Sequence, residues 1–265
     1  MPAMQLSALY RYPLKSGRAQ SLQQAAISAV GLDGDRVWML IDEHGEMITG
    51  REFPKLVLID VAADAHGACF TAPDREPLCV RTEAFVVDQD CEVWGNRFTA
   101  LRGDAMADAW FSAYLGAPCS LLYIGDAPGR RRLVGEPDIA LSFADGYPLL
   151  LIGEGSLDDL NSRLARPVPM TSFRPNLVVA GAEAFAEDQW RQLRIGAVTF
   201  EVAKPCTRCI FTTVDPALGE KSADRQPLLT LAKYRRFAIG TCFGMNLIAR
   251  SNGVLRIDDP VQILA

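Results

Sequence analysis

The feature that most constrains the fold is the succession of short apolar runs and turn residues in the first ninety or so residues. Residues 36–49 read as two strands around a His44-Gly45 turn, and residues 55–72 repeat this hairpin pattern around His66-Gly67. Residues 4–14 alternate more weakly and add another strand. Short strands at this spacing are typical of a barrel or a sandwich. The sequence therefore predicts an all-β N-terminal part.

Helical patterns interrupt the strands at two places. Residues 102–118 carry apolar side chains near helical spacing and close at Gly116; these side chains are Met106, Trp110, Phe111 and Tyr114. Further along, Ser156 is a predicted N-cap, and Leu157, Leu160 and Leu164 share one face of the helix that it begins.

The rest of the chain reads as strands and loops. Residues 125–147 are rich in glycine, proline and charge and predict a long surface loop, whereas the apolar run that follows, up to Gly153, predicts a buried strand. Strands and turns fill the chain from residue 173 onward. Because strands and helices do not alternate regularly, the expected class is mainly β, an α+β protein with a few helices, and not a doubly wound sheet.

Bulk properties exclude several classes of function. With 265 residues and 49% hydrophobic content, the chain can bury a large core, and its net charge of −5 argues against nucleic acid as a partner. No run approaches the roughly 18 apolar residues of a spanning helix, and the first residues do not resemble a secretory signal. We expect a cytoplasmic protein without a membrane partner.

The cysteines support this location. Their number, seven, is odd and they are widely spread, which is not the pattern of a disulfide framework. Most of them stand singly in apolar surroundings, which favours small buried hydrophobic side chains.

One cysteine pair stands apart, in residues 204–216 with the sequence KPCTRCIFTTVDP. A structural zinc site would need a second cysteine pair or a histidine pair at ligand spacing, and the chain has neither. A dithiol of the thioredoxin type needs Cys206 at a helix N-terminus, whereas the β-branched and aromatic residues after Cys209 predict a strand. Two interpretations remain: both cysteines only pack, or one is a thiolate that binds a redox metal completed by a cofactor. Lys204 and Arg208 favour the thiolate.

Several motifs together resemble a known family. They are YPLKSG at residues 12–17, GDRVWMLID at 34–42, DLNSRL at 159–164, SFRPNLVVAG at 172–181 and KPCTRCIFTTVDP at 204–216, in the family's order over essentially the whole chain. They identify the chain as similar to the MOSC proteins that carry an N-terminal MOSC β-barrel, and most of all to the mitochondrial amidoxime-reducing component and its bacterial relatives. The resemblance implies a MOSC β-barrel fold, with the N-terminal barrel domain over residues 1–120 and the MOSC domain over residues 121–265.

The resemblance also implies a molybdenum-molybdopterin cofactor between the two domains. Cys209 would be the single protein ligand of the metal and hence the catalytic residue, with Cys206 as a neighbour of lesser role. The residues expected to bind the cofactor are Lys15, Ser16, Arg36, Asp145, Gly146, Tyr147, Arg174, Asn176 and Arg208. Lys15, Ser16 and Arg36 would hold the terminal phosphate, with Arg51 as a weaker candidate. Pro175 should keep Arg174 extended beside the pterin, and Asn246 lies near the expected substrate side without an assigned role.

The implied activity is reduction of N-hydroxylated compounds, such as amidoximes, by removal of oxygen at molybdenum. Many bacterial relatives continue into a ferredoxin-like domain, which this sequence lacks, so electrons should come from an external flavin or iron–sulfur protein. The mitochondrial membrane anchor is also absent from this sequence. An alternative function is that of a cofactor or sulfur carrier, as at the end of molybdenum-cofactor sulfurases. A second alternative is a barrel that has lost its cofactor.

Overall fold

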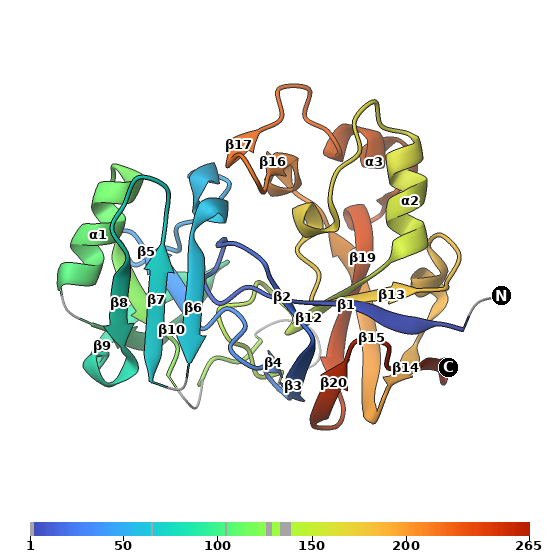
Figure 1. Cartoon of the computed structure of the whole chain (residues 1–265), viewed down its shortest axis with the longest axis horizontal. Helices are drawn as coiled ribbons and strands as arrows, with labels where there is room; N and C mark the ends of the chain where they lie inside the picture. Colours follow the sequence, from blue (N-terminus) through green and yellow to red (C-terminus); the bar gives the residue numbers. More distant parts are fainter. Residues whose placement is uncertain (1–2, 65, 104, 126–128, 133–138) are drawn as a thin grey trace.

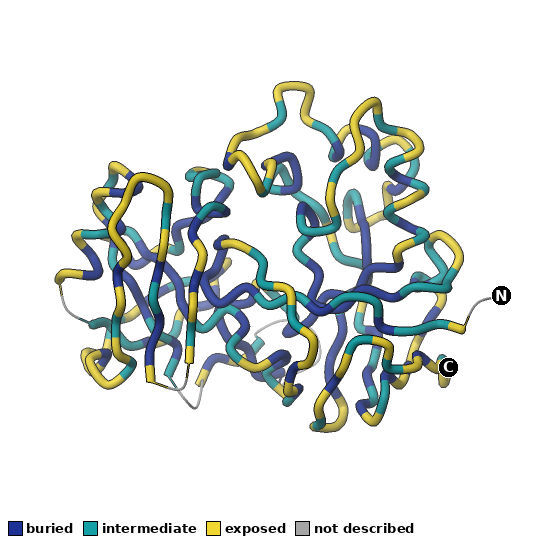
Figure 2. The backbone as a smooth tube through the Cα atoms, viewed as in Figure 1, coloured by how far each residue is buried: buried dark blue, intermediate teal, exposed yellow. Residues whose placement is uncertain are grey.

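The computed structural model describes residues 3–64, 66–103, 105–125, 129–132 and 139–265. Two β-rich parts lie side by side, joined by strands that cross the centre of the molecule (Figure 1). Buried segments run through the interior of both parts, while the outer turns are exposed (Figure 2). The fold is mainly β with three α-helices in the described residues, which confirms the expected α+β class.

The larger sheet has nine strands in the order β2-β1-β13-β12-β19-β15-β14-β21, and β18 pairs with β19 beside this path. Its members are β1 (Gln5–Arg11), β2 (Gln20–Leu22), β12 (Leu149–Gly153), β13 (Leu177–Ala180), β14 (Gln192–Ile195), β15 (Val198–Thr207), β18 (Arg236–Phe237), β19 (Gly240–Ala249) and β21 (Val261–Ile263). Every residue of β12 is buried, as its apolar run predicts. The core of this part packs around side chains such as Leu151, Phe200 and Leu247.

The N-terminal part contains a four-stranded sheet, β5-β11-β10-β9, and a three-stranded sheet, β6-β7-β8. These strands are β5 (Trp38–Ile41), β6 (Asp60–Asp64), β7 (Gly67–Thr71), β8 (Leu78–Arg81), β9 (Val87–Val93), β10 (Asn96–Arg102) and β11 (Ser120–Tyr123). Trp38 packs edge-on against Phe70 and Phe85 at the centre of this part. The hairpin predicted around Gly67 is confirmed by the pairing of β6 with β7. Its first strand begins at Asp60 and not at residue 55, because residues 54–58 form the 3-10 helix η1 (Pro54–Leu58), which Pro54 favours.

Strand pairing crosses the sequence division expected at residue 120. Strand β1 pairs with β13, so the N-terminus belongs to the larger sheet. A small sheet, β20-β3-β4, likewise joins β3 (Gln24–Ser28) and β4 (Gly31–Leu32) to β20 (Gly253–Arg256), and β11 pairs with β5 and β10 of the N-terminal part. The domain boundary at residue 120 stays a prediction, but the two parts are interwoven on both sides of it.

The helices agree with the sequence in place and differ in detail. Helix α1 (Ala105–Leu115) forms where it was predicted, and Phe111 and Tyr114 are buried, but Met106 is 63% exposed. Helix α2 (Glu154–Ser162) begins after Gly153, so the prediction of Ser156 as N-cap is wrong. Ser156 instead donates a hydrogen bond to the buried carboxylate of Glu187, which also accepts from the amide of Gly153 at the helix start.

Helix α3 (Leu228–Tyr234) and a two-stranded ribbon complete the fold. The ribbon pairs β16 (Val214–Asp215) with β17 (Glu220–Lys221). Helices α2 and α3 lie next to each other at one end of the larger sheet (Figure 1). No helix of the described residues is long and apolar enough to span a membrane.

The cysteines correct one expectation. Cys91, Cys119 and Cys242 are buried free thiols, as predicted. Cys69 and Cys79, which we expected to be buried single thiols, form a disulfide, and Cys79 is exposed. They are direct partners on the antiparallel strands β7 and β8, with Cα atoms 4.0 Å apart, and cross-strand neighbours lie close enough to be bridged.

Candidate functional site

A cavity of about 160 Å³ brings together every residue that the sequence singled out as a cofactor ligand. Its walls include Lys15, Ser16, Arg36, Asp145, Gly146, Tyr147, Arg174, Asn176, Arg208 and Cys209. Cys206, Arg51 and Asn246 line it as well. The cavity is formed by the loops after β1 and before β5, the segment before β12, the segment before β13, and the end of β15.

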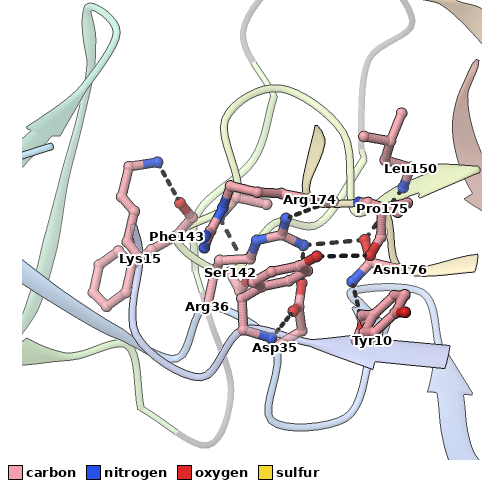
Figure 3. Close-up of polar contacts among 12 residues, drawn as sticks. Tyr10, Lys15, Asp35, Arg36, Ser142, Phe143, Leu150, Arg174, Pro175 and Asn176 are labelled. Atoms are coloured by element: carbon pink, nitrogen blue, oxygen red, sulfur yellow. Dashed lines mark hydrogen bonds and ion pairs between the residues drawn. The ribbon is translucent and has the colours of Figure 1, made fainter. Parts of the chain in front are cut away.

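Lys15 and Ser16 stand on a tight turn. The amide of Gly17 donates to the carbonyl of Leu14 at 2.8 Å, and Ser16 has a left-handed backbone with φ of 66°. The buried Lys15 ammonium donates to the Phe143 carbonyl at 2.8 Å (Figure 3) and to Asp145 Oδ1 at 2.5 Å. Ser16 Oγ accepts from the amide of Gly50 at 3.0 Å. The turn therefore holds a cation and a hydroxyl at the cavity wall.

Arg36 is fixed by buried polar partners. Its Nη1 donates to Asp35 and to Asn176 Oδ1, the latter at 3.0 Å, and its guanidinium lies 4.7 Å from the centre of the Tyr12 ring (Figure 3). Burial alone would lower the pKa of Arg36, but the charge and hydrogen bond of Asp35, together with the charges of Tyr12 and Asp145, outweigh it, and the net shift is upward. Arg36 is thus a permanent cation in a fixed position.

Asn176 uses its side-chain amide for hydrogen bonds within the protein. It is fully buried, and its Oδ1 accepts from Arg36 and from the amide of Leu150, while its Nδ2 donates to the Tyr10 carbonyl at 3.2 Å. These bonds tie β1 to β12 and hold the Arg36 guanidinium (Figure 3). Whether Asn176 also meets a cofactor stays a prediction, and its observed role is to position Arg36.

Arg174 corrects an expectation about the backbone. Pro175 should make Arg174 extended, but Arg174 is left-handed, with φ of 57°. It caps the C-terminal end of η3 (Met170–Phe173), where its amide donates to the carbonyl of Thr171 at 3.2 Å. Proline disfavours the right-handed region in the preceding residue, and the left-handed region is the alternative taken here. The guanidinium lies 4.1 Å from the Tyr12 ring centre and donates from Nη1 to the Gly17 carbonyl at 2.7 Å.

The CxxC segment also differs from its sequence prediction. Strand β15 ends at Thr207, and the residues after Cys209 form the 3-10 helix η5 (Ile210–Thr213) where a strand was predicted. The hydroxyls of Thr212 and Thr213 donate to the carbonyls three residues earlier, at 2.9 and 2.7 Å. Threonine can satisfy the backbone locally in this way, which overrides its preference for strands.

The two cysteines have different surroundings. Both are half-buried free thiols. Arg208 donates from Nη1 to Cys206 Sγ at 3.0 Å and from Nη2 to the Phe173 carbonyl at 2.8 Å. Among the described residues, no hydrogen bond to Cys209 Sγ is found, although this residue lines the cavity. The Cys209 thiol is therefore the more available of the two for a ligand in the cavity.

The loop before β12 is anchored by a residue that the sequence did not single out. Arg130 is only 2% exposed and donates to the carbonyls of Ser142 at 2.7 Å and Ala144 at 2.5 Å, and to that of Asp145 at 3.3 Å. Residues 139–144 are buried, so this part of the predicted surface loop lies in the interior; residues 126–128 and 133–138 of that prediction lie outside the described residues. Arg130 stands in the run Arg130-Arg131-Arg132, and no signal in the sequence distinguishes it.

Asp145 is held from two sides of the cavity mouth. Its Oδ1 accepts from Lys15 and from the indole Nε1–H of Trp94 at 2.9 Å. The Asp145 side chain is 67% exposed at the cavity wall. Crowding by the surrounding protein would raise its pKa, but the charge and hydrogen bond of Lys15, the bond from Trp94 and the charge of Arg36 together hold the pKa well below its usual range. Asp145 is therefore ionised at neutral pH. Trp94, like Arg130, was missed by the sequence reasoning.

Gly146, Tyr147 and Asn246 are further predicted residues of the cavity wall. A Cβ added to Gly146 would meet no atom within 4 Å, so open space adjoins its backbone in the cavity wall. The Tyr147 hydroxyl accepts from Arg132 Nη1 at 2.5 Å. Asn246 donates through Nδ2 to the carbonyls of Lys204 and Pro205 at 3.3 and 3.4 Å, which fixes the approach to the CxxC segment.

More positively than negatively charged side chains line the cavity. Lys15, Arg36, Arg51, Arg174 and Arg208 all line it, and the only carboxylate among its described lining residues is Asp145. Within the described chain, Arg174 Nη2 and Arg208 Nε are buried without a hydrogen-bond partner. Burial lowers the pKa of Arg174 to about 10, which leaves it charged at neutral pH. Buried cations with unused donors fit an anionic ligand rich in hydrogen-bond acceptors.

Comparison with known proteins agrees with this arrangement. Residues 3–118 match the MOSC N-terminal beta barrel domain, and residues 138–262 match the MOSC domain. The human protein "Mitochondrial amidoxime-reducing component 1" is 33% identical to the chain, over 97% of this chain and 82% of that protein. The chain belongs to the MOSC protein family. The cavity of this MOSC protein is lined by residues of both matched segments, with Lys15 and Arg36 from the first and Arg174 and Cys209 from the second.

Other relatives give the same picture. Human "Mitochondrial amidoxime reducing component 2" is 34% identical to this MOSC protein, over 96% of this chain and 81% of that protein. Among solved structures, the YUAD protein from Bacillus subtilis aligns over 98% of this chain and 94% of its own, with a TM-score of 0.47 and 12% sequence identity.

Proposed function

We propose that this MOSC protein binds the molybdenum cofactor and reduces N-hydroxylated compounds, amidoximes among them, by removing oxygen. The MOSC family is associated in general with this cofactor, and the relatives described above are named for amidoxime reduction. The observation that carries the proposal is the cavity in which the available Cys209 thiol shares the walls with Arg174 and Arg208, two half-buried cations that each have a buried donor atom without a partner in the described structure.

The residues present fit the group. Molybdopterin ends in a phosphate, and Lys15, Arg36 and Arg174 provide the fixed cations that such an anion requires. The open space beside Gly146 leaves room for a ligand against the backbone. Cys209 provides a soft sulfur ligand of the kind that a redox-active transition metal prefers. When bound, the molybdenum centre would supply the two electrons that cleave the N–O bond of the substrate.

The chain's own residues orient the ligands and set the charge. Asn176 and Asp35 hold the Arg36 guanidinium in place, and Arg130 holds the loop that carries Asp145. Removing oxygen as water consumes two protons for every two electrons. We propose that solvent delivers the protons through the open cavity mouth, and that a separate flavin or iron–sulfur protein delivers the electrons.

A second candidate function is favoured by Cys206. The Arg208 guanidinium donates a hydrogen bond to its sulfur at 3.0 Å, which holds this side chain in the cavity wall. A second sulfur of this kind in the cavity would suit a protein that carries the cofactor or sulfur without reducing a substrate.

Turnover of an amidoxime distinguishes the two functions. Protein purified from a molybdenum-replete host is incubated with benzamidoxime and a chemical reductant, and benzamidine is measured. We expect catalytic formation of benzamidine that depends on Cys209. Stoichiometric pterin without any turnover would refute the reductase and leave the carrier.

A further inference from the structure

A second cavity, of about 450 Å³, shares a wall with the first. Thr49, Arg51 and Trp94 line both cavities, and Glu46, Met47 and Glu92 lie on the outer one. The outer cavity therefore lies directly beside the mouth of the inner one. Anything that passes from it toward Cys209 meets the side chains of Arg51 and Trp94 first.

Trp94 combines a left-handed backbone with an exposed side chain that has a fixed hydrogen-bond partner. It stands on the turn between β9 and β10, where its φ of 52° is left-handed, a conformation that bulky residues rarely adopt. Its side chain is not in the core: the residue is 49% exposed. The indole nitrogen nevertheless has a fixed partner, because it donates to Asp145 Oδ1 at 2.9 Å. The ring is thus an exposed apolar surface held at a set place.

Arg51 shows what kind of group this ring accepts. Its guanidinium carbon lies 4.1 Å from the centre of the Trp94 ring. A guanidinium is planar, delocalised and cationic, and so is an amidinium; both are attracted to the face of an indole ring. A ligand with an amidine head and an attached aromatic ring could therefore take the place of Arg51 on this surface.

The charges of the outer cavity permit such a ligand. Its carboxylates are Glu46, Glu52 and Glu92, and its one cation among the described lining residues is Arg51. Glu92 is paired with Arg97 at 2.9 Å. Once Arg51 leaves the ring, the carboxylates of Glu46 and Glu52 remain to attract a positively charged head group such as an amidinium.

We propose that Trp94 forms a substrate subsite at the cavity mouth, which stacks planar aryl amidines and their N-hydroxylated forms in competition with Arg51. The reaction that follows binding rests on the proposed function, but the subsite itself does not. It selects for flat substrates, because a saturated ring cannot place a π-face or an edge against the indole in the same way.

Binding of benzamidine, measured by isothermal titration calorimetry on the purified protein, tests the subsite without turnover. We expect Trp94→Leu to weaken benzamidine binding roughly tenfold. Trp94→Phe keeps a ring but loses the hydrogen bond to Asp145, and it should bind within about threefold of wild type. Arg51→Met, which removes the competing guanidinium, should bind more tightly than wild type.

Trp110→Phe is the matched control, because Trp110 lies on α1 against Tyr114 and outside both cavities. This variant should bind benzamidine with the affinity of wild type.

The choice of ligand adds a second control. Cyclohexanecarboxamidine has the same charged head on a saturated ring. Its affinity should be weaker than that of benzamidine and should fall less in Trp94→Leu, because only the amidinium is left to contact the indole. Equal affinity of wild type and Trp94→Leu for benzamidine would overturn the subsite, as would weaker binding by Arg51→Met. If benzamidine binding depends on Trp94 while benzamidoxime is not reduced, the subsite stands and the proposed function fails. If benzamidoxime is reduced and its KM is unchanged in Trp94→Leu, the subsite fails and the function stands.

Discussion

The Arg208 guanidinium donates a hydrogen bond to Cys206 Sγ at 3.0 Å, from the residue that separates the two cysteines of the CxxC segment. This contact makes the two thiols unequal. Cys206 is engaged by Arg208 and packs against the apolar cluster around Phe173 and Phe243. Both cysteines line the cavity, and among the described residues no hydrogen bond to the sulfur of Cys209 is found.

We therefore expect Cys206→Ser to change little. A serine oxygen can accept the same bond from Arg208, so the free energy of unfolding should fall by roughly 1 kcal/mol or less. The molybdenum content should stay near that of wild type. Chemical denaturation gives the free energy of unfolding, and metal analysis on the same preparation gives the molybdenum content. Complete loss of the metal would contradict the prediction that Cys209 and not Cys206 binds it.

Arg174 should matter more for retention of the cofactor than for stability. Its Nη2 is buried without a partner in the described structure, so a cofactor anion gains a donor that the fold does not use. We expect Arg174→Gln to lower the pterin content of the purified protein at least several-fold. Fluorescence of the released, oxidised pterin gives the content. Arg174→Lys, which keeps the charge without the planar fork, should fall between wild type and glutamine; equal pterin in all three would contradict an anion contact.

Arg130 should be required for stability. Arg130→Met leaves the carbonyls of Ser142 and Ala144 without a donor in a buried loop, and the loss should cost roughly 2–4 kcal/mol in the free energy of unfolding. Urea denaturation provides the measurement. Arg75→Met, at an exposed arginine, is the control, and an equal loss in both variants would argue against a special role for Arg130.

The pair of Lys15 and Asp145 should make stability depend on pH in the acid range. The folded-state pKa of Asp145 lies below its usual range, so between the two values the unfolded chain binds more protons than the folded one. The stabilising contribution is present above the unfolded pKa and is lost as the pH falls toward the folded pKa. The stability difference between wild type and Asp145→Asn should therefore be constant from about pH 6 to 8 and shrink below about pH 4. A difference that stayed constant in acid would contradict the pairing.

The sequence predicts the elements of this fold better than their details. The hairpin around Gly67, the buried run of β12 and the position of α1 all follow from local periodicity. Local patterns failed where a distant residue decides the structure. Glu187, not Ser156, satisfies the start of α2.

The same limit applies to the cavity. Its predicted residues came from a resemblance of motifs, and the structure brings all of them together. Trp94 and Arg130 could not be found in this way, because a tryptophan in a turn and an arginine in an arginine run look like surface residues until Asp145 and the loop at residues 142–145 are placed beside them.

Metal analysis of the Cys209→Ser variant tests the central claim most directly. Wild type, Cys209→Ser and Cys206→Ser are purified side by side from a molybdenum-replete host, and molybdenum per chain is measured by mass spectrometry. We expect molybdenum in wild type and in Cys206→Ser, and its loss from Cys209→Ser, because this variant removes the one protein sulfur proposed to bind the metal. Equal molybdenum in wild type and Cys209→Ser would contradict the assignment of Cys209 as the metal ligand.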